Sequence, residues 1–112
     1  MTRSFLQFAS LSFAVLVGSS LQATAADDTG HAQFLKYGCW QCHGTEGQGT
    51  SAGPKLAPEP LPYEAFSAFV RSSSRQMPPF REQVLPDQDL QAIHAYLSSR
   101  PPAVDVKKFI DP

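Results

Sequence analysis

The sequence predicts an all-α fold, and two observations support that prediction. Apolar residues recur at helical spacing in three segments, near residues 30–37, 63–73 and 87–99, whereas no segment shows the alternation typical of a strand. Between the first two segments, the stretch from Gly44 to Pro62 is dense in glycine and proline, which disfavours regular structure. We therefore expect three main helices joined by long irregular loops.

The N-terminus has the features of a secretory signal peptide. Arg3 supplies a positive charge, Leu11 to Val17 form a short apolar stretch, and Ala23-Thr24-Ala25 is a small-x-small cleavage pattern. We expect residues 1–25 to be a signal peptide and residues 26–112 to form one small domain. The apolar stretch is shorter than the roughly 20 residues that span a bilayer. The competing interpretation is an uncleaved N-terminal anchor, and the chain would associate with a membrane only in that case.

The first helix is expected to begin at an N-cap among Asp27, Asp28 and Thr29 and to end at Gly38. His31 is expected to be exposed on it. Its apolar residues are Ala32, Phe34, Leu35 and Tyr37.

The next five residues, Cys39-Trp40-Gln41-Cys42-His43, have the Cys-x-x-Cys-His spacing of a covalent haem attachment site. Two intervening residues place both thiols on one side of a single turn, where they can add to the two vinyl groups of a porphyrin. The histidine that follows can reach the iron from the proximal side. The pattern predicts one haem c, bound through Cys39 and Cys42 and ligated by His43, and it assigns no role to Trp40.

Three other uses of the cysteine pair fit the chain less well. A thioredoxin-like dithiol needs a helix in a βαβ pattern, and no strand run flanks this motif. A structural zinc site needs four ligands, yet the chain has only these two cysteines, and His31 and His94 are single and distant. A disulfide between Cys39 and Cys42 would close a very short loop and stabilise little.

The second and third helices follow the irregular stretch. The second is expected from Tyr63 to Ser73 and the third from Asp87 to Ser99, before Arg100-Pro101-Pro102. The residues at helical spacing are Tyr63, Phe66, Phe69 and Val70 in the second, and Leu90, Ile93 and Leu97 in the third.

With these motifs in order, the chain resembles the small class I c-type cytochromes of bacteria over nearly all of residues 26–112. The motifs that carry the resemblance are Cys39 to His43, Gly53-Pro54-Lys55-Leu56, Met77-Pro78-Pro79-Phe80, and Leu90 to Leu97 with Tyr96. The resemblance implies a cytochrome c fold, with helices around one covalently attached haem. It also implies that the last helix packs across the first.

Met77 is the candidate for the second axial ligand of the iron. Once Met1 is removed with the signal, Met77 is the only thioether in the chain, and it lies in a proline-stiffened loop. A soft sulfur suits haem iron and raises its potential relative to a second histidine. The alternatives are that Met77 fills a gap in the core, or that His94 is the ligand. His94 lies in the middle of the third helix, which does not ligate the haem in the family.

The resemblance further implies that the carbonyl of Pro54 accepts a hydrogen bond from His43 and so orients the ligand. Alternatively, Gly53-Pro54 is only a turn. One departure from the family concerns Gly30 and Phe34, which lie one residue further from Cys39 than is usual. Gly38 can absorb the extra residue, but the expected pairing of Phe34 with Tyr96 depends on it.

Charge and resemblance together suggest a function class. The net charge is −1, and no basic stripe indicates nucleic-acid binding. The resemblance implies a periplasmic electron carrier, not an enzyme, that passes electrons from a dehydrogenase toward the respiratory chain, with an oxidase or another cytochrome as acceptor. One alternative is a cytochrome subunit held permanently in a dehydrogenase complex. Another is a haem enzyme or gas sensor with an open iron position, which Met77 argues against.

Overall fold

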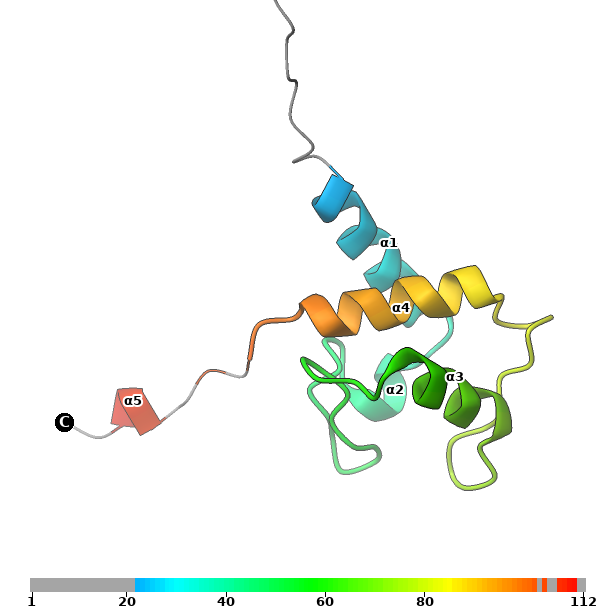
Figure 1. Cartoon of the computed structure of the whole chain (residues 1–112). Coiled ribbons are helices and arrows are strands. Elements are labelled where there is room, and N and C mark those ends of the chain that lie inside the picture. The colour runs from blue at the N-terminus through cyan, green and yellow to red at the C-terminus, as the bar shows by residue number, and fades with distance from the viewer. Residues whose placement is uncertain (1–21, 103, 105–106, 111–112) are drawn as a thin grey trace, which may run out of the picture.

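The computed structural model describes residues 22–102, 104 and 107–110, so residues 1–21 of the expected signal peptide lie outside this part of the chain. The described residues contain helices and no strand, which confirms the all-α prediction (Figure 1). None of these helices is long and apolar enough to cross a lipid bilayer. In chain order they are α1 (Gln22–Lys36), α2 (Trp40–His43), α3 (Tyr63–Ser72), α4 (Asp87–Ser99) and α5 (Lys107–Ile110).

Helix α4 lies across α1, and these two helices make the most extensive contact between elements of the fold (Figure 1). The crossing is close because Gly30 has no side chain. A Cβ at this position would overlap the carbonyl oxygen of Ala92 and lie 2.6 Å from the Cβ of Tyr96. One turn later, the ring of Phe34 packs against the ring of Tyr96. The expected pairing of the two helices is therefore present.

Helix α3 packs on α4 and completes the core. The apolar residues expected to face inward from α3 and α4 do so, except that Phe69 is 52% exposed. The two helices are joined by a loop whose residue Leu85 is almost fully buried. The buried apolar residues are Phe34, Ala57, Phe66, Val70, Leu85, Leu90, Ile93, Tyr96 and Leu97.

The sequence predicted only part of the buried face of α1 correctly. Phe34 is fully buried, but Ala32 and Leu35 are exposed. The face that meets α4 is the row of Gly30 and Phe34, four residues apart, because the crossing and not the local hydrophobicity decides which side turns inward. His31, expected to be exposed, is partly buried, and its ring stacks on that of Tyr96 with centroids 4.8 Å apart.

The ends of α1 also differ in how well the sequence predicted them. The expected N-caps Asp27, Asp28 and Thr29 lie inside the helix, because the alanine-rich residues before them are good helix formers and continue it. The end was predicted correctly. Gly38 has a φ of +75°, and the amides of Gly38 and Cys39 donate to the carbonyls of Leu35 and Phe34 at 3.1 and 3.2 Å. These are the two bonds of a Schellman motif.

Candidate functional site

Four residues of the motif, Trp40 to His43, form the short helix α2, and Cys39 is its N-cap residue. Gly38 and Gly44 flank the motif with φ values of +75° and +79°, which favour glycine. Within α2 the amide of His43 donates to the carbonyl of Cys39 at 3.1 Å, so Cys39 and His43 lie one turn apart. Cys39 is partly buried, Cys42 is exposed, and both are free thiols. The motif is thus a single rigid turn with its reactive groups spread along one side.

His43 is buried, with 7% of its surface exposed, and is held by the following loop. Its Nδ1 lies 2.7 Å from the carbonyl oxygen of Pro54. Since a carbonyl only accepts, Nδ1 is the protonated nitrogen of the neutral ring and Nε2 is the nitrogen with the free lone pair.

The loop from Gly44 to Pro62 is tied back onto α2 beside this histidine. A Cβ at Gly53 would lie 2.8 Å from the carbonyl oxygen of Cys42, so only glycine allows the approach. The hydroxyl of Thr50 donates to the same carbonyl at 2.5 Å, and the amide of Gly49 donates to the carbonyl of His43 at 2.8 Å. This packing places Pro54 beside the histidine ring.

Met77 lies in the loop between α3 and α4, partly buried and packed against the core. The hydroxyl of Ser73, just beyond the end of α3, donates to the carbonyl of Met77 at 2.8 Å. Ser73 is itself buried. The backbone of Met77 is therefore tied to the end of the helix that precedes it.

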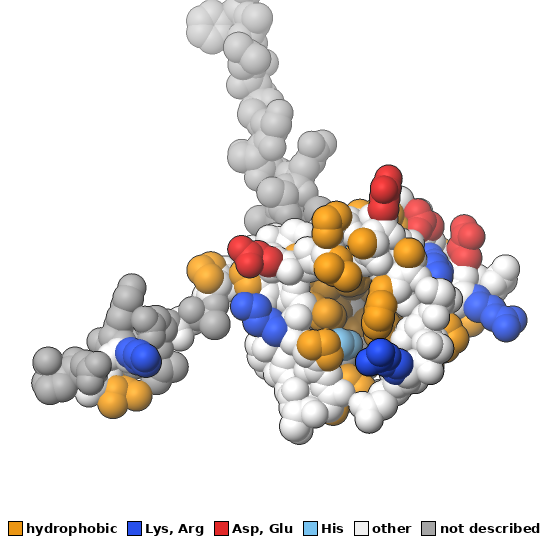
Figure 2. Space-filling model, turned by 60° about the horizontal axis from the view of Figure 1, so that its bottom comes forward, with side chains coloured by type: hydrophobic (Ala, Val, Ile, Leu, Met, Phe, Trp, Pro, Cys, Tyr) orange, Lys and Arg blue, Asp and Glu red, His pale blue; other side chains and the backbone are white. Residues whose placement is uncertain are grey.

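One cavity of about 920 Å³ brings these segments together, and most of its lining is apolar. All five residues predicted for the site line it: Cys39, Cys42, His43, Pro54 and Met77. Figure 2 shows one face of the molecule, on which hydrophobic side chains and a histidine border a hollow, with a basic side chain beside the histidine. Exposed Leu61 and Phe69 and the basic residues Lys55 and Arg75 also line this cavity.

The donor set and the cavity fit a haem. Two thiols, a buried imidazole with one nitrogen free and a thioether converge on an apolar space, and the volume lies within the range of cofactor pockets, about 300 to 1,000 Å³. Burial also raises the pKa of the Cys39 thiol to about 11. The Cys39 side chain is therefore a neutral thiol at physiological pH in this structure.

The other two histidines are engaged elsewhere. His94 Nε2 lies 2.8 Å from the carbonyl oxygen of Leu61, and its ring contacts those of Tyr63 and Phe66 edge-on. His31 Nε2 lies 3.3 Å from the carbonyl oxygen of Thr45 and 3.7 Å from a carboxylate oxygen of Glu46. Both histidines therefore contact the loop from Gly44 to Pro62, His31 from α1 and His94 from α4. Trp40 is 42% exposed.

Sequence reasoning missed Arg71, in the last turn of α3. Its guanidinium donates to the carbonyls of Phe80 and Leu85, in the loop that carries Met77. The only signal in the sequence is a single arginine near a helix C-terminus, where a cation is favourable in any case. Its partners are backbone carbonyls, which no side-chain pattern reveals.

Comparison with known proteins agrees with this geometry. The family model described as cytochrome c oxidase, cbb3-type, subunit III matches residues 25–97. The match covers α1 from its second turn to the last turn of α4, and with them every residue that the sequence predicted for the site. No curated protein and no solved structure matches the chain.

Proposed function

Because the chain belongs to the family of cytochrome c oxidase, cbb3-type, subunit III, we propose that it is a one-electron carrier that binds a single haem c between His43 and Met77. Membership makes it a small c-type cytochrome, and the activity of such a domain is electron transfer through haem c. The observation that supports the finer proposal is the cavity of about 920 Å³ that the motif shares with Met77.

Cys39 and Cys42 provide the covalent attachment. Each thiol would hold the haem through one thioether, formed by addition of S–H across a vinyl group without an oxidant. Cys39 is the N-cap residue of α2 and Cys42 lies within it, so one short turn would hold the haem through both residues. Burial raises the pKa of the Cys39 thiol to about 11, which disfavours its thiolate in the closed structure.

His43 serves as the proximal ligand through Nε2. The contact of 2.7 Å between Nδ1 and the Pro54 carbonyl sets the tautomer and the orientation of the ring. The same hydrogen bond makes the imidazole a stronger donor to the metal. The approach of Gly53 to Cys42 keeps Pro54 at this distance.

Met77 serves as the distal ligand, and its role separates a carrier from an enzyme. A bound haem c supplies the one-electron couple of its iron. A thioether that stays in place in both oxidation states denies small molecules an open position and keeps structural change on electron transfer small. The hydrogen bond from Ser73 to the Met77 carbonyl supports this by fixing the backbone of the ligand loop.

We place the carrier in the periplasm, on the basis of the signal-peptide pattern of residues 1–25. The family description supports redox partners in a respiratory complex. A dehydrogenase is the proposed donor and an oxidase or another cytochrome the proposed acceptor. Exposed Leu61 and Phe69, at the cavity mouth, provide an apolar contact area for brief encounters.

The second candidate is a subunit held permanently in a respiratory complex, and the family description, which names an oxidase subunit, favours it. Purification from native membranes and periplasm separates the two. A free carrier appears in the periplasmic fraction as a monomer, whereas a fixed subunit remains with its complex through detergent extraction.

Spectroscopy of the purified protein tests the ligation. After expression with c-type maturation enzymes, the oxidised protein should show the weak near-infrared absorption of sulfur-to-iron charge transfer. The reduced protein should bind CO slowly or not at all. Rapid, stoichiometric CO binding by the wild type would instead indicate an open position and the chemistry of an enzyme or gas sensor.

A further inference from the structure

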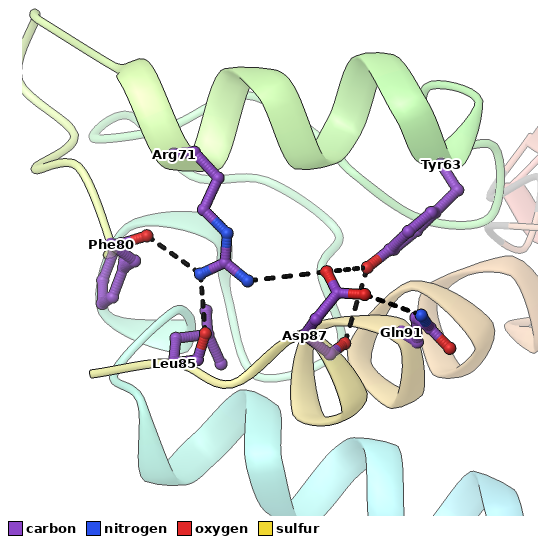
Figure 3. Close-up of polar contacts among 6 residues, drawn as sticks. All are labelled: Tyr63, Arg71, Phe80, Leu85, Asp87 and Gln91. Carbon is purple, nitrogen blue, oxygen red and sulfur yellow. Dashed lines mark hydrogen bonds and ion pairs between the residues drawn. The ribbon is translucent and has the colours of Figure 1, made fainter. Parts of the chain in front are cut away.

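Arg71 connects the end of α3 to two points of the loop that carries Met77, both of them after the methionine. Its Nη1 donates to the carbonyl of Phe80 at 3.0 Å and to the carbonyl of Leu85 at 2.6 Å (Figure 3). Phe80 follows the Met77-Pro78-Pro79 segment directly, and Leu85 is the buried residue just before α4. One nitrogen therefore holds two points of the same loop.

The guanidinium is oriented from its other side by Asp87, in the first turn of α4. Nη2 of Arg71 lies 3.6 Å from Oδ1 of Asp87 and is buried without a hydrogen bond of its own. The hydroxyl of Tyr63 donates to the same Oδ1 at 2.7 Å, and the amide of Gln91 donates to Oδ2 at 2.8 Å (Figure 3). Asp87 is thus fixed by two donors and in turn faces the guanidinium.

Two further hydrogen bonds tie the loop to the end of α3. The amide of Phe80 donates to the carbonyl of Val70 at 2.9 Å, and the hydroxyl of Ser73 donates to the carbonyl of Met77 at 2.8 Å. The Met77 segment is therefore tied to the end of α3 at the methionine itself and again three residues after it. Among these contacts between α3 and the loop, only those of Arg71 extend to Leu85, near the start of α4.

We propose that Arg71 is a positioning residue for the ligand loop, which keeps the Met77 thioether at the haem iron and slows its replacement by other ligands. The inference rests on the proposed ligation by Met77. The planar guanidinium suits the task because its several N–H donors are held in fixed directions, whereas a lysine ammonium has no such fork. Loss of the two carbonyl contacts leaves Phe80 held to α3 by its amide alone and removes the tie between α3 and Leu85.

The rate at which added imidazole displaces the Met77 thioether in the oxidised holoprotein measures how firmly the loop holds this ligand. Imidazole can bind only after the thioether leaves, so at saturating imidazole the rate reports opening of the loop. We expect Arg71→Lys, which keeps the charge, and Arg71→Met, which keeps only the stem, to accelerate replacement. The expected acceleration is about ten- to a hundredfold, as for the loss of a hydrogen bond to a charged group. Asp87→Asn, which weakens the orientation of Arg71, should accelerate it less.

Two controls separate positioning from general stability. Arg81 is an exposed arginine in the same loop and does not line the cavity, so Arg81→Lys should leave the rate unchanged. Tyr96→Phe removes the hydrogen bond from Tyr96 to Glu46, which involves no residue of the ligand loop, and should lower the melting temperature without changing the rate. If Arg71→Met does not fold, the exchange rates of Arg71→Lys and Asp87→Asn are compared with the wild type instead.

Three results would contradict the proposal, and they are distinguishable. If the wild type shows the near-infrared band but Arg71→Lys exchanges no faster than Arg81→Lys, the role of Arg71 is refuted and Met77 ligation stands. If Tyr96→Phe accelerates exchange as much as Arg71→Lys, the effect is one of global stability and the role is again refuted. If the wild type lacks the band and matches Met77→Ala, the ligation itself is wrong, and the inference fails with it.

Discussion

The ring of Phe34 in α1 lies against the ring of Tyr96 in α4, with centroids 5.9 Å apart and planes inclined by 49°. The ring of His31 is also stacked on that of Tyr96, with centroids 4.8 Å apart, and the Arg100 guanidinium lies 5.0 Å from the Tyr96 ring centroid. The Tyr96 hydroxyl donates to Oε2 of Glu46 at 2.9 Å. This one tyrosine therefore joins both helices of the crossing to the loop that follows α2.

The helix crossing should tolerate no side chain at Gly30. Gly30→Ala places a Cβ against the Ala92 carbonyl and Tyr96, so the helices have to move apart even though alanine is the better helix former. We expect a loss of about 1–3 kcal/mol in the free energy of unfolding, measured by denaturant titration of the holoprotein. Ala32→Ser, at an exposed position of the same helix, is the control and should change little. Equal stability of the two variants would disprove the close approach.

The stability of the protein should decrease in alkali through Tyr96. Burial, and then the hydrogen bond to Glu46, raise the pKa of Tyr96 to about 12. An unfolded tyrosine ionises near pH 10, so the contribution is complete below that pH and is lost as the pH rises toward 12. The loss amounts to about 2–3 kcal/mol.

Tyr96→Phe should remove this part of the pH dependence while costing about 1 kcal/mol at neutral pH for the lost hydrogen bond. Denaturant unfolding of the wild type and the variant between pH 8 and 12 measures the pH dependence of the free energy of unfolding. Burial and the hydrogen bond to Asp87 also raise the pKa of Tyr63, but both proteins keep that residue, so its effect cancels. Parallel curves for the two proteins would rule out the role of Tyr96.

Covalent attachment predicts that haem stays on the polypeptide through acid-acetone extraction and denaturing gels. Cys39→Ala or Cys42→Ala should leave one weak thioether or no holoprotein. His43→Ala should be worse, because it removes both the proximal ligand and the group held by Pro54. Mass spectrometry of the chain checks the attachment. A wild-type mass without added haem, after expression with the maturation enzymes, would refute it.

Met77→Ala should open the distal position. The reduced variant should bind CO rapidly and stoichiometrically, the near-infrared band should vanish, and the potential should fall because the thioether favours the reduced iron. Redox titration and CO binding measure the change. Pro79→Ala, exposed in the same loop, is the control and should retain the band. A variant that keeps the potential of the wild type would show that Met77 is a packing residue.

The chain without haem should be largely unfolded. The cavity of about 920 Å³ borders Phe34, Phe66, Leu90 and Ile93, so much of the small core would face it without a cofactor. Each helix is also close to or below the length at which isolated helices are even marginal in water. Circular dichroism of the haem-free chain should show little helix and no sharp thermal transition.

Alkylation of Cys39 provides an independent check on the haem-free chain. In a Cys42→Ser chain made without haem, an unfolded Cys39 should react with the pH dependence of a thiol of pKa about 8.5. A haem-free chain folded as described here would react with a pKa of about 11. The higher value, together with a cooperative melt, would show that the protein core suffices alone.

The sequence by itself determined the local structure and the chemistry. Helical spacing located α3 and α4 to within a residue, and Gly38 ended α1 where expected, because these features depend on backbone propensities within a few residues. The Cys39 to His43 motif indicated the cofactor for the same reason, since one turn contains the two thiols and the imidazole.

The tertiary structure decided which faces and partners meet. The sequence predicted that Ala32 and Leu35 belong to the apolar face of α1. The close crossing at Gly30 instead turns Phe34 inward and leaves Ala32 and Leu35 exposed. Arg71 was invisible as a loop anchor because its partners are backbone carbonyls from a distant segment. Such contacts exist only after the chain has closed, when burial and the requirement to satisfy each buried polar group select one arrangement among many.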